Sequence, residues 1–207
     1  MWILLDIKMD DDAELLVSAI ARAVQEVPSG SVPWEKRMVL GCWNASTLLA
    51  ARRHLPNYAL SHIGTSASYA AHFLGPQPNL ALNLAYTAVP FAPFSSSSSS
   101  SSLPPPRRLR PSSSPPLFAW TVNGESTMRW ALAHGNIDAV VTDDPAAFRA
   151  LCRRWEDEVA GRALPPLRLP LLRSLALRWD WCCVRLRHRL VFLYRRFWLR
   201  KLDYLSS

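Results

Sequence analysis

The stretch from Phe118 to Pro145, FAWTVNGESTMRWALAHGNIDAVVTDDP, contains two short apolar runs with a helix-like segment between them. The first run ends in Trp120-Thr121-Val122-Asn123, and the second occupies residues 137–141. Between them, apolar residues recur at helical spacing from Glu125 to His134. A strand, a helix and a second strand in this order predict two parallel strands joined by a right-handed crossover.

The same alternation extends over the N-terminal part of the chain. Strand-like apolar runs occupy residues 2–8, 37–42, 58–63 and 79–84, and helices are expected over residues 13–27, 45–54 and 67–74. Asp10, Asn44 and Ser66 are each placed to cap one of these helices, and Asp143 is placed to cap a helix after the last strand. The apolar stripe of the first helix is expected at Leu15, Leu16, Ala19, Ile20 and Ala23. Six strands alternating with helices predict an α/β fold.

A low-complexity segment at 93–116 interrupts this pattern. Eight consecutive serines at 95–102 are followed by proline, arginine and more serine. Such a composition cannot bury enough apolar surface to fold, so the segment is expected to be a mobile insert. We therefore expect one domain over residues 1–160, with this insert, and a tail over 161–207.

The positive charge of the chain is concentrated in that tail. The formal net charge is +8, and residues 162–207 carry eleven Lys or Arg and two Asp, a net charge of +9. An apolar stripe and an arginine stripe recur there at helical spacing: Leu175, Trp179, Cys182, Leu186, Leu190, Leu193 and Phe197, and Arg178, Arg185, Arg189, Arg196 and Arg200. The pattern favours an amphipathic helix on an anionic membrane surface. A helix that packs on the domain with solvated arginines is the alternative.

Other classes of function receive less support from the composition. No nucleic-acid-binding motif accompanies the charge, so no nucleic-acid partner is expected. The chain opens on a strand-like run without a basic segment or a cleavage site, and its four cysteines show no disulfide or zinc spacing. We expect an intracellular protein, peripheral on a membrane or lipid droplet and not secreted.

Several motifs resemble the glycerophosphodiester phosphodiesterase family. The WTVN strand end at 120–123 and the IDAVVTDDP strand end at 137–145 resemble the family's last two strands, and DIK at 6–8 resembles its (E/D)-I-K strand end. LPNYALSHIG at 55–64 is most similar to the fungal branch that includes phosphatidylglycerol phospholipase C. The resemblance covers residues 1–90 and 117–150. It implies a TIM-barrel-type fold and hydrolysis of glycerophosphodiesters or of a phospholipid headgroup, with a divalent metal, Mg²⁺ or Ca²⁺, as cofactor.

The resemblance also implies roles for particular residues. Asp6 falls where the family places a metal-binding carboxylate and Lys8 where it places a phosphate-facing cation, and residues two apart on a strand share a face. Trp43, Trp120 and Asn123 would wall a headgroup pocket. His62 is a candidate for proton transfer at the mouth of the barrel. The alternatives are a strand-end ion pair for Asp6 and Lys8, core packing for both tryptophans, and a hydrogen-bonded structural role for His62.

Three of the family's motifs are absent from the sequence. The family's first strand ends in His-Arg-Gly, its second in Glu-x-Asp and its third region in His-Asp, and none of these occurs here. The resemblance therefore implies an incomplete barrel that lacks the first strands, most metal ligands and the catalytic histidines. Asp6 alone is a poor site for Mg²⁺ or Ca²⁺, which prefer several oxygen ligands. A catalytically inactive membrane-associated fragment or pseudoenzyme is the alternative to an active hydrolase.

Overall fold

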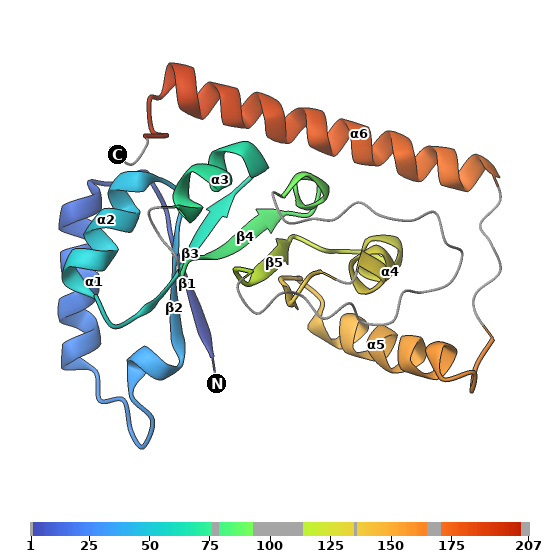
Figure 1. The fold of residues 1–207 in the computed structure, drawn as a ribbon, viewed down its shortest axis with the longest axis horizontal. Helices are drawn as coiled ribbons and strands as arrows, with labels where there is room; N and C mark the ends of the chain where they lie inside the picture. The colour runs from blue at the N-terminus through green and yellow to red at the C-terminus, as the bar shows by residue number, and fades with distance from the viewer. Residues whose placement is uncertain (1, 76–78, 93–113, 135, 165–170, 204–207) are drawn as a thin grey trace.

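The computed structural model describes residues 2–75, 79–92, 114–134, 136–164 and 171–203, with the backbone alone at 171–178 and 180. These residues form one parallel sheet with helices packed around it (Figure 1). Most of the low-complexity insert predicted at 93–116 lies outside the described residues.

The described sheet contains six parallel strands in sequential order, so each strand pairs with the next one along the chain. The strands are β1 (Ile3–Ile7), β2 (Met38–Cys42), β3 (Ala59–Gly64), β4 (Ala81–Ala85), β5 (Leu117–Trp120) and β6 (Ala139–Val140). Sequential order without a reversal is the winding of a barrel, whereas a doubly wound sheet reverses at a switch point. The sheet is a curled half-barrel, and the predicted α/β class and incomplete TIM-barrel-like fold are confirmed to this extent.

Helices follow most of the strands. They are α1 (Ala13–Glu26), α2 (Ala45–His54), α3 (Ala67–Leu74), α4 (Glu125–His134), α5 (Pro145–Val159) and α6 (Leu171–Leu193). Single 3₁₀ turns lie at Trp34–Lys36 (η1) and Val89–Phe91 (η2), and a π-helical turn, η3 (Tyr194–Trp198), extends α6. The helices predicted over 13–27, 45–54 and 67–74 are thus present within one residue of their expected ends.

Two of the four predicted helix caps are correct. Asn44 and Ser66 accept hydrogen bonds from Thr47 N and Tyr69 N at the starts of α2 and α3. The other two caps are wrong. Asp12, in place of Asp10, caps α1, and Asp144, in place of Asp143, caps α5. In each case a neighbouring aspartate stands directly before the first helical residue, where a cap must be.

The main core lies between the convex side of the sheet and the helices. Alternate strand residues point to it, including Leu40, Cys42, Leu82, Leu84 and Leu117, which are fully buried. Helix α1 contributes Val17 and Ala21. The predicted stripe of α1 is partly correct, because Leu16 and Ile20 pack against the core, whereas Leu15 is 72% exposed.

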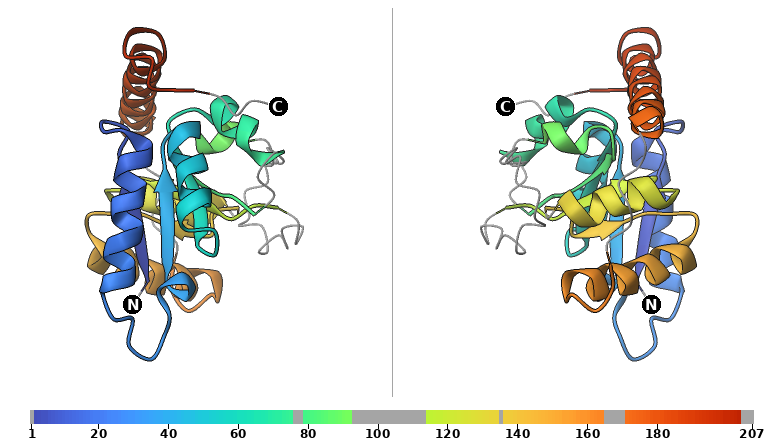
Figure 2. Two further views of the ribbon diagram at one scale, coloured as in Figure 1. Left: turned by 90° about the vertical axis from the view of Figure 1, so that its left-hand side faces the viewer. Right: turned by 90° about the vertical axis from the view of Figure 1, so that its right-hand side faces the viewer.

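Helix α6 lies across the end of the half-barrel at which the strands terminate. In the two views of Figure 2 it stands at one end of the molecule, while the N-terminus lies at the other end. The sequence left open whether the tail packs on the domain, and here α6 packs on it. Within the described residues, no helix has the apolar length needed to cross a bilayer.

Candidate functional site

Four side chains meet at the carboxyl ends of the strands, and we call Asp6, Lys8, Trp43 and Trp120 the strand-end cluster. Trp43 Nε1 donates a hydrogen bond to Asp6 Oδ1 over 2.7 Å, and Lys8 Nζ lies 2.5 Å from Asp6 Oδ2. Lys8 Nζ also lies 4.9 Å from the centre of the Trp43 ring, and the rings of Trp43 and Trp120 meet edge-on with centres 5.5 Å apart. The cluster combines one carboxylate, one ammonium group and two aromatic walls.

The strands bring these residues together because alternate side chains share a face. Asp6 lies beside Gly41 in the register of β1 and β2, so Trp43, two residues after Gly41, follows on the same concave face. A Cβ atom at Gly41 would lie 2.5 Å from Ile63 Cδ1, so a larger residue there would require the Ile63 side chain to shift. Trp120 ends β5 and is held by a hydrogen bond from its Nε1 to Asn83 O over 2.9 Å.

The tail covers the strand-end cluster. The Arg195 guanidinium lies 5.0 Å from the centre of the Trp43 ring, and the His188 ring lies 5.9 Å from the Trp120 ring. Between tail and sheet there is a cavity of about 10 Å³, lined by Met9, Trp43, Gly64, Thr65, Tyr69, Phe192, Arg195 and Leu202. A molecule that occupies the cluster must therefore displace side chains of α6 and η3.

Asn123 lies at the ends of β5 and β6. Its side-chain Nδ2 donates to Asp143 Oδ2 over 2.5 Å, and its Oδ1 accepts from Asp143 N and Thr142 Oγ1. These contacts hold the two strand ends together, and the structure gives no contact between Asn123 and the strand-end cluster. They also explain why Asp143 does not cap α5.

His62 does not lie at the mouth, and this predicted position is wrong. The ring is fully buried beneath α3, between Tyr69 and Phe73, and its Nδ1 lies 3.2 Å from Cys42 O. The residue alternates with Ile63, which faces the concave side, so His62 must face the helices. Burial lowers the pKa of His62 to about 3, which leaves the ring neutral at physiological pH.

Sequence reasoning missed three residues that the structure places near the cluster. Ser61 and Asn83 are buried on the concave face, and neither Ser61 Oγ nor Asn83 Oδ1 has a partner among the described residues. Polar residues inside apolar strand runs were the available signal. His188 of α6 lies against Trp120, and its Nδ1 is 3.0 Å from Thr87 Oγ1. Burial, together with the neighbouring Arg187, lowers the pKa of His188.

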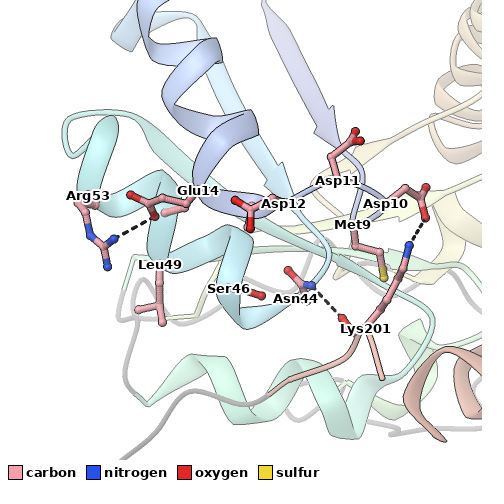
Figure 3. Close-up of a pocket in the computed structure, with 12 residues that line it drawn as sticks. Met9, Asp10, Asp11, Asp12, Glu14, Asn44, Ser46, Leu49, Arg53 and Lys201 are labelled. Carbon is pink, nitrogen blue, oxygen red and sulfur yellow. Dashed lines mark hydrogen bonds and ion pairs between the residues drawn. The ribbon is translucent and has the colours of Figure 1, made fainter. Parts of the chain in front are cut away.

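A second hollow lies beside the cluster, between the starts of α1 and α2. Its volume is about 580 Å³, and it is lined by Asp10, Asp11, Asp12, Glu14, Arg53 and Lys201 among others (Figure 3). Lys201 Nζ lies 2.8 Å from Asp10, and Arg53 lies 2.9 Å from Glu14. The hydrogen bond from Lys201 lowers the pKa of Asp10. Hydrogen bonds from His54 and, to a smaller extent, from Arg53 lower the pKa of Glu14. Two of the four carboxylates in this hollow are thus already paired with basic side chains.

The described residues do not form a divalent-metal site of the expected kind. Asp6 is the only carboxylate of the strand-end cluster, and both of its oxygens already accept hydrogen bonds. No group of three His, Cys, Asp or Glu residues in the described part of the chain is placed to hold a metal ion. Mg²⁺ and Ca²⁺ prefer several oxygen ligands, so the residues present do not fit the predicted metal by themselves.

Comparison with known proteins gives a family match over most of this domain. A family model described as "Glycerophosphoryl diester phosphodiesterase family" matches residues 4–147. The crystal structure of a glycerophosphodiester phosphodiesterase from Parabacteroides distasonis is similar, with 18% sequence identity and a TM-score of 0.49. That match covers 74% of this chain, which spans 58% of the solved chain. No curated protein matches.

Proposed function

Since this chain belongs to the glycerophosphoryl diester phosphodiesterase family, we propose that it binds and hydrolyses glycerophosphodiesters at the strand-end cluster. Water would cleave the phosphodiester to a phosphomonoester and an alcohol. The observation that supports this function is the meeting of Asp6, Lys8, Trp43 and Trp120 at the carboxyl ends of parallel strands, where barrel enzymes carry their chemistry.

Each member of the cluster has a part in recognition. The Lys8 side chain is 56% exposed, and its ammonium group is a cation available to a phosphate oxygen. Asp6 orients it and fixes Trp43 through the indole N–H. The two indole rings form an edge-on pair whose apolar faces suit the carbon skeleton of a glycerol headgroup.

Proton transfer is assigned to His188. Of the histidines in the described residues, it is the one in ring contact with a member of the cluster. Its lowered pKa keeps the ring neutral at physiological pH, so it can accept a proton from attacking water. The family's own histidine motifs are absent from the sequence, and His62 is buried elsewhere.

A divalent cation is the cofactor that the family resemblance implies. Asp6 is the carboxylate that would contribute to holding it, with further oxygens from substrate phosphate and water, as Mg²⁺ commonly takes. The cation would neutralise phosphate charge when bound. The described residues provide no second carboxylate at this point, so none of the steps above relies on it.

A phosphatidylglycerol-like lipid is the proposed physiological substrate, on the basis of the similarity to the fungal branch. The exposed apolar residues of α6 support a membrane location. Several members of its apolar stripe stay exposed: Trp179 (72%), Leu186 (59%), Leu190 (57%), Leu193 (46%) and Phe197 (65%). Exposed arginines accompany this stripe, including Arg187 and Arg189. Apolar and basic residues together favour an anionic lipid surface.

A second candidate is a non-catalytic, membrane-associated protein that binds the same headgroup. The absence of His-Arg-Gly, Glu-x-Asp and His-Asp favours it. The six-stranded order also leaves β1 and β6 each with one neighbour among the described strands. In this case the cluster would bind its ligand without turnover.

The experiment that separates the two functions measures binding and turnover on one sample. Glycerophosphoglycerol is titrated into the full chain by calorimetry, and phosphomonoester release is followed by ³¹P NMR with and without Mg²⁺ or Ca²⁺. Binding with release supports the hydrolase, and binding without release supports the second candidate. Absence of binding contradicts both.

A further inference from the structure

A hollow of about 610 Å³ lies between α6 and the loops that follow β3 and β4. We call it the α6 pocket. Helices α3 and α6, which border it, lie side by side in Figure 1. Its volume falls within the range of small-molecule sites, and it opens at the carboxyl ends of the strands, where α/β sheets bind ligands. The α6 wall lies outside residues 4–147, which the family model matches.

The polar part of the α6 pocket has the chemistry of an anion site. Arg185 and Arg189 are one helical turn apart on α6 and both line the pocket. Arg185 stacks on Phe91 at 4.0 Å, and neither guanidinium has a carboxylate partner among the side chains that the structure describes. Two uncompensated guanidinium groups in one hollow favour a phosphate, which arginine binds through paired N–H donors.

Hydroxyl groups face the arginines from the opposite wall. Thr65, Ser66, Ser68 and Thr87 line the pocket on the side of the sheet and α3. Ser66 Oγ and Ser68 Oγ lie 3.0 Å apart, and Thr87 Oγ1 is bonded to His188. Hydroxyl groups complete the coordination of phosphate oxygens that guanidinium groups leave free.

The remaining wall is apolar and continues onto the surface. Leu186, Leu190 and Leu193 line the pocket and also belong to the exposed apolar stripe of α6. A ligand with its phosphate at Arg185 and Arg189 can therefore lay an alkyl chain along these leucines without leaving apolar contact. A free phosphate ester would use the polar wall alone.

We propose that the α6 pocket binds a phosphate ester that carries an alkyl chain, such as the headgroup end of a single-chain phospholipid. This site adjoins the strand-end cluster through His188, which lines the pocket and contacts Trp120. Its ligand is bound and not hydrolysed, so the proposal does not depend on phosphodiesterase activity.

Calorimetric titration of the full chain tests the proposal with three probes below their micelle concentrations. Octyl phosphate carries both phosphate and chain, methyl phosphate lacks the long chain, and octyl glucoside lacks the phosphate. We expect saturable binding of octyl phosphate, weaker binding of methyl phosphate and none of octyl glucoside. Methyl phosphate binding as tightly as octyl phosphate, or equal binding of octyl glucoside, would overturn the proposal.

Paired variants locate the site. The R185Q/R189Q variant should bind octyl phosphate on the order of tenfold to a hundredfold more weakly, the loss expected for charged hydrogen bonds. The R187Q/R196Q variant removes the same charge from the same segment outside the pocket and should keep the wild-type affinity. Equal affinity of the two variants would place the ligand elsewhere. If R185Q/R189Q does not fold, R189Q alone, at an exposed position, must still weaken binding relative to R187Q.

Discussion

The Asp203 carboxylate lies on the first turn of α2, where Oδ1 accepts a hydrogen bond from Ala45 N over 2.8 Å. Oδ2 accepts from Ser46 N over 3.1 Å and from Ser46 Oγ. An anion at a helix N-terminus is favourable, because the first backbone N–H groups lack partners within the helix. Asn44 Nδ2 and Tyr69 OH bond to Lys201 O and Asp203 O nearby. The segment 201–203 is thus joined to α2 and α3.

Removing the Asp203 charge should loosen this junction. The D203N variant should lose about 1–2 kcal/mol of unfolding free energy, as expected for charged hydrogen bonds at a helix start. Urea denaturation measures the loss. The D11N variant serves as the control. It removes an exposed carboxylate that lines the hollow between α1 and α2, and it should change stability little. Equal midpoints for the two variants would show that the Asp203 contact contributes nothing.

Acid should destabilise the chain through His62. Its folded-state pKa of about 3 lies below the ordinary value of 6.5. Below pH 6.5 the unfolded state therefore binds more protons than the folded state, and stability decreases as the pH is lowered. One such group contributes a slope of up to about 1.4 kcal/mol per pH unit. The H62N variant should therefore show a smaller loss of stability between pH 7 and pH 5 than wild type. The exposed His72 is the control: H72N should keep the wild-type slope, and equal slopes for H62N and H72N would contradict the prediction.

Lipid binding should depend on the exposed apolar stripe of α6. The full chain should co-sediment with anionic vesicles more than with zwitterionic ones, and added salt should weaken the attachment through screening. Leu190 is 57% exposed on α6 and Leu15 is 72% exposed on α1. L190S should reduce sedimentation and L15S should not. Equal partitioning into both vesicle types, or none into either, would show that the arginines are only solvated.

Asp6 should matter more for ligand binding than for stability. Both partners of its ion pair with Lys8 are about half exposed, so losing the pair in D6N should cost no more than about 1 kcal/mol of unfolding free energy. Asparagine keeps an oxygen for the Trp43 indole but no longer fixes Lys8. Glycerophosphoglycerol should therefore bind D6N more weakly while the urea midpoint stays near wild type. Unchanged affinity would leave Asp6 as a strand-end ion pair without function.

Local periodicity was sufficient to predict most of the fold. The strands and helices appear where apolar alternation and helical spacing placed them, because those patterns decide which face is buried. The predicted caps Asp10 and Asp143 are wrong for a local reason. In both cases another aspartate, Asp12 or Asp144, stands directly before the first helical residue.

The candidate site was only partly predictable. Asp6, Lys8, Trp43 and Trp120 share one face by alternation, and the structure brings them together. The burial of His62 depended on α3 covering the sheet, and the approach of His188 depended on α6 crossing the strand ends. Both are packing contacts between different segments of the chain. The spacing of residues within one segment carries no information about such contacts.

The most direct test of the proposed function compares hydrolysis by two lysine variants. Lys8 belongs to the strand-end cluster, and Lys36 is an exposed lysine on η1. With glycerophosphoglycerol as substrate and phosphomonoester release followed by ³¹P NMR, K36Q should match wild type. K8Q should be slower by about 10²-fold, as for loss of one charge-stabilising donor. No release by the wild-type chain, or equal rates for K8Q and K36Q, would contradict hydrolysis at this cluster.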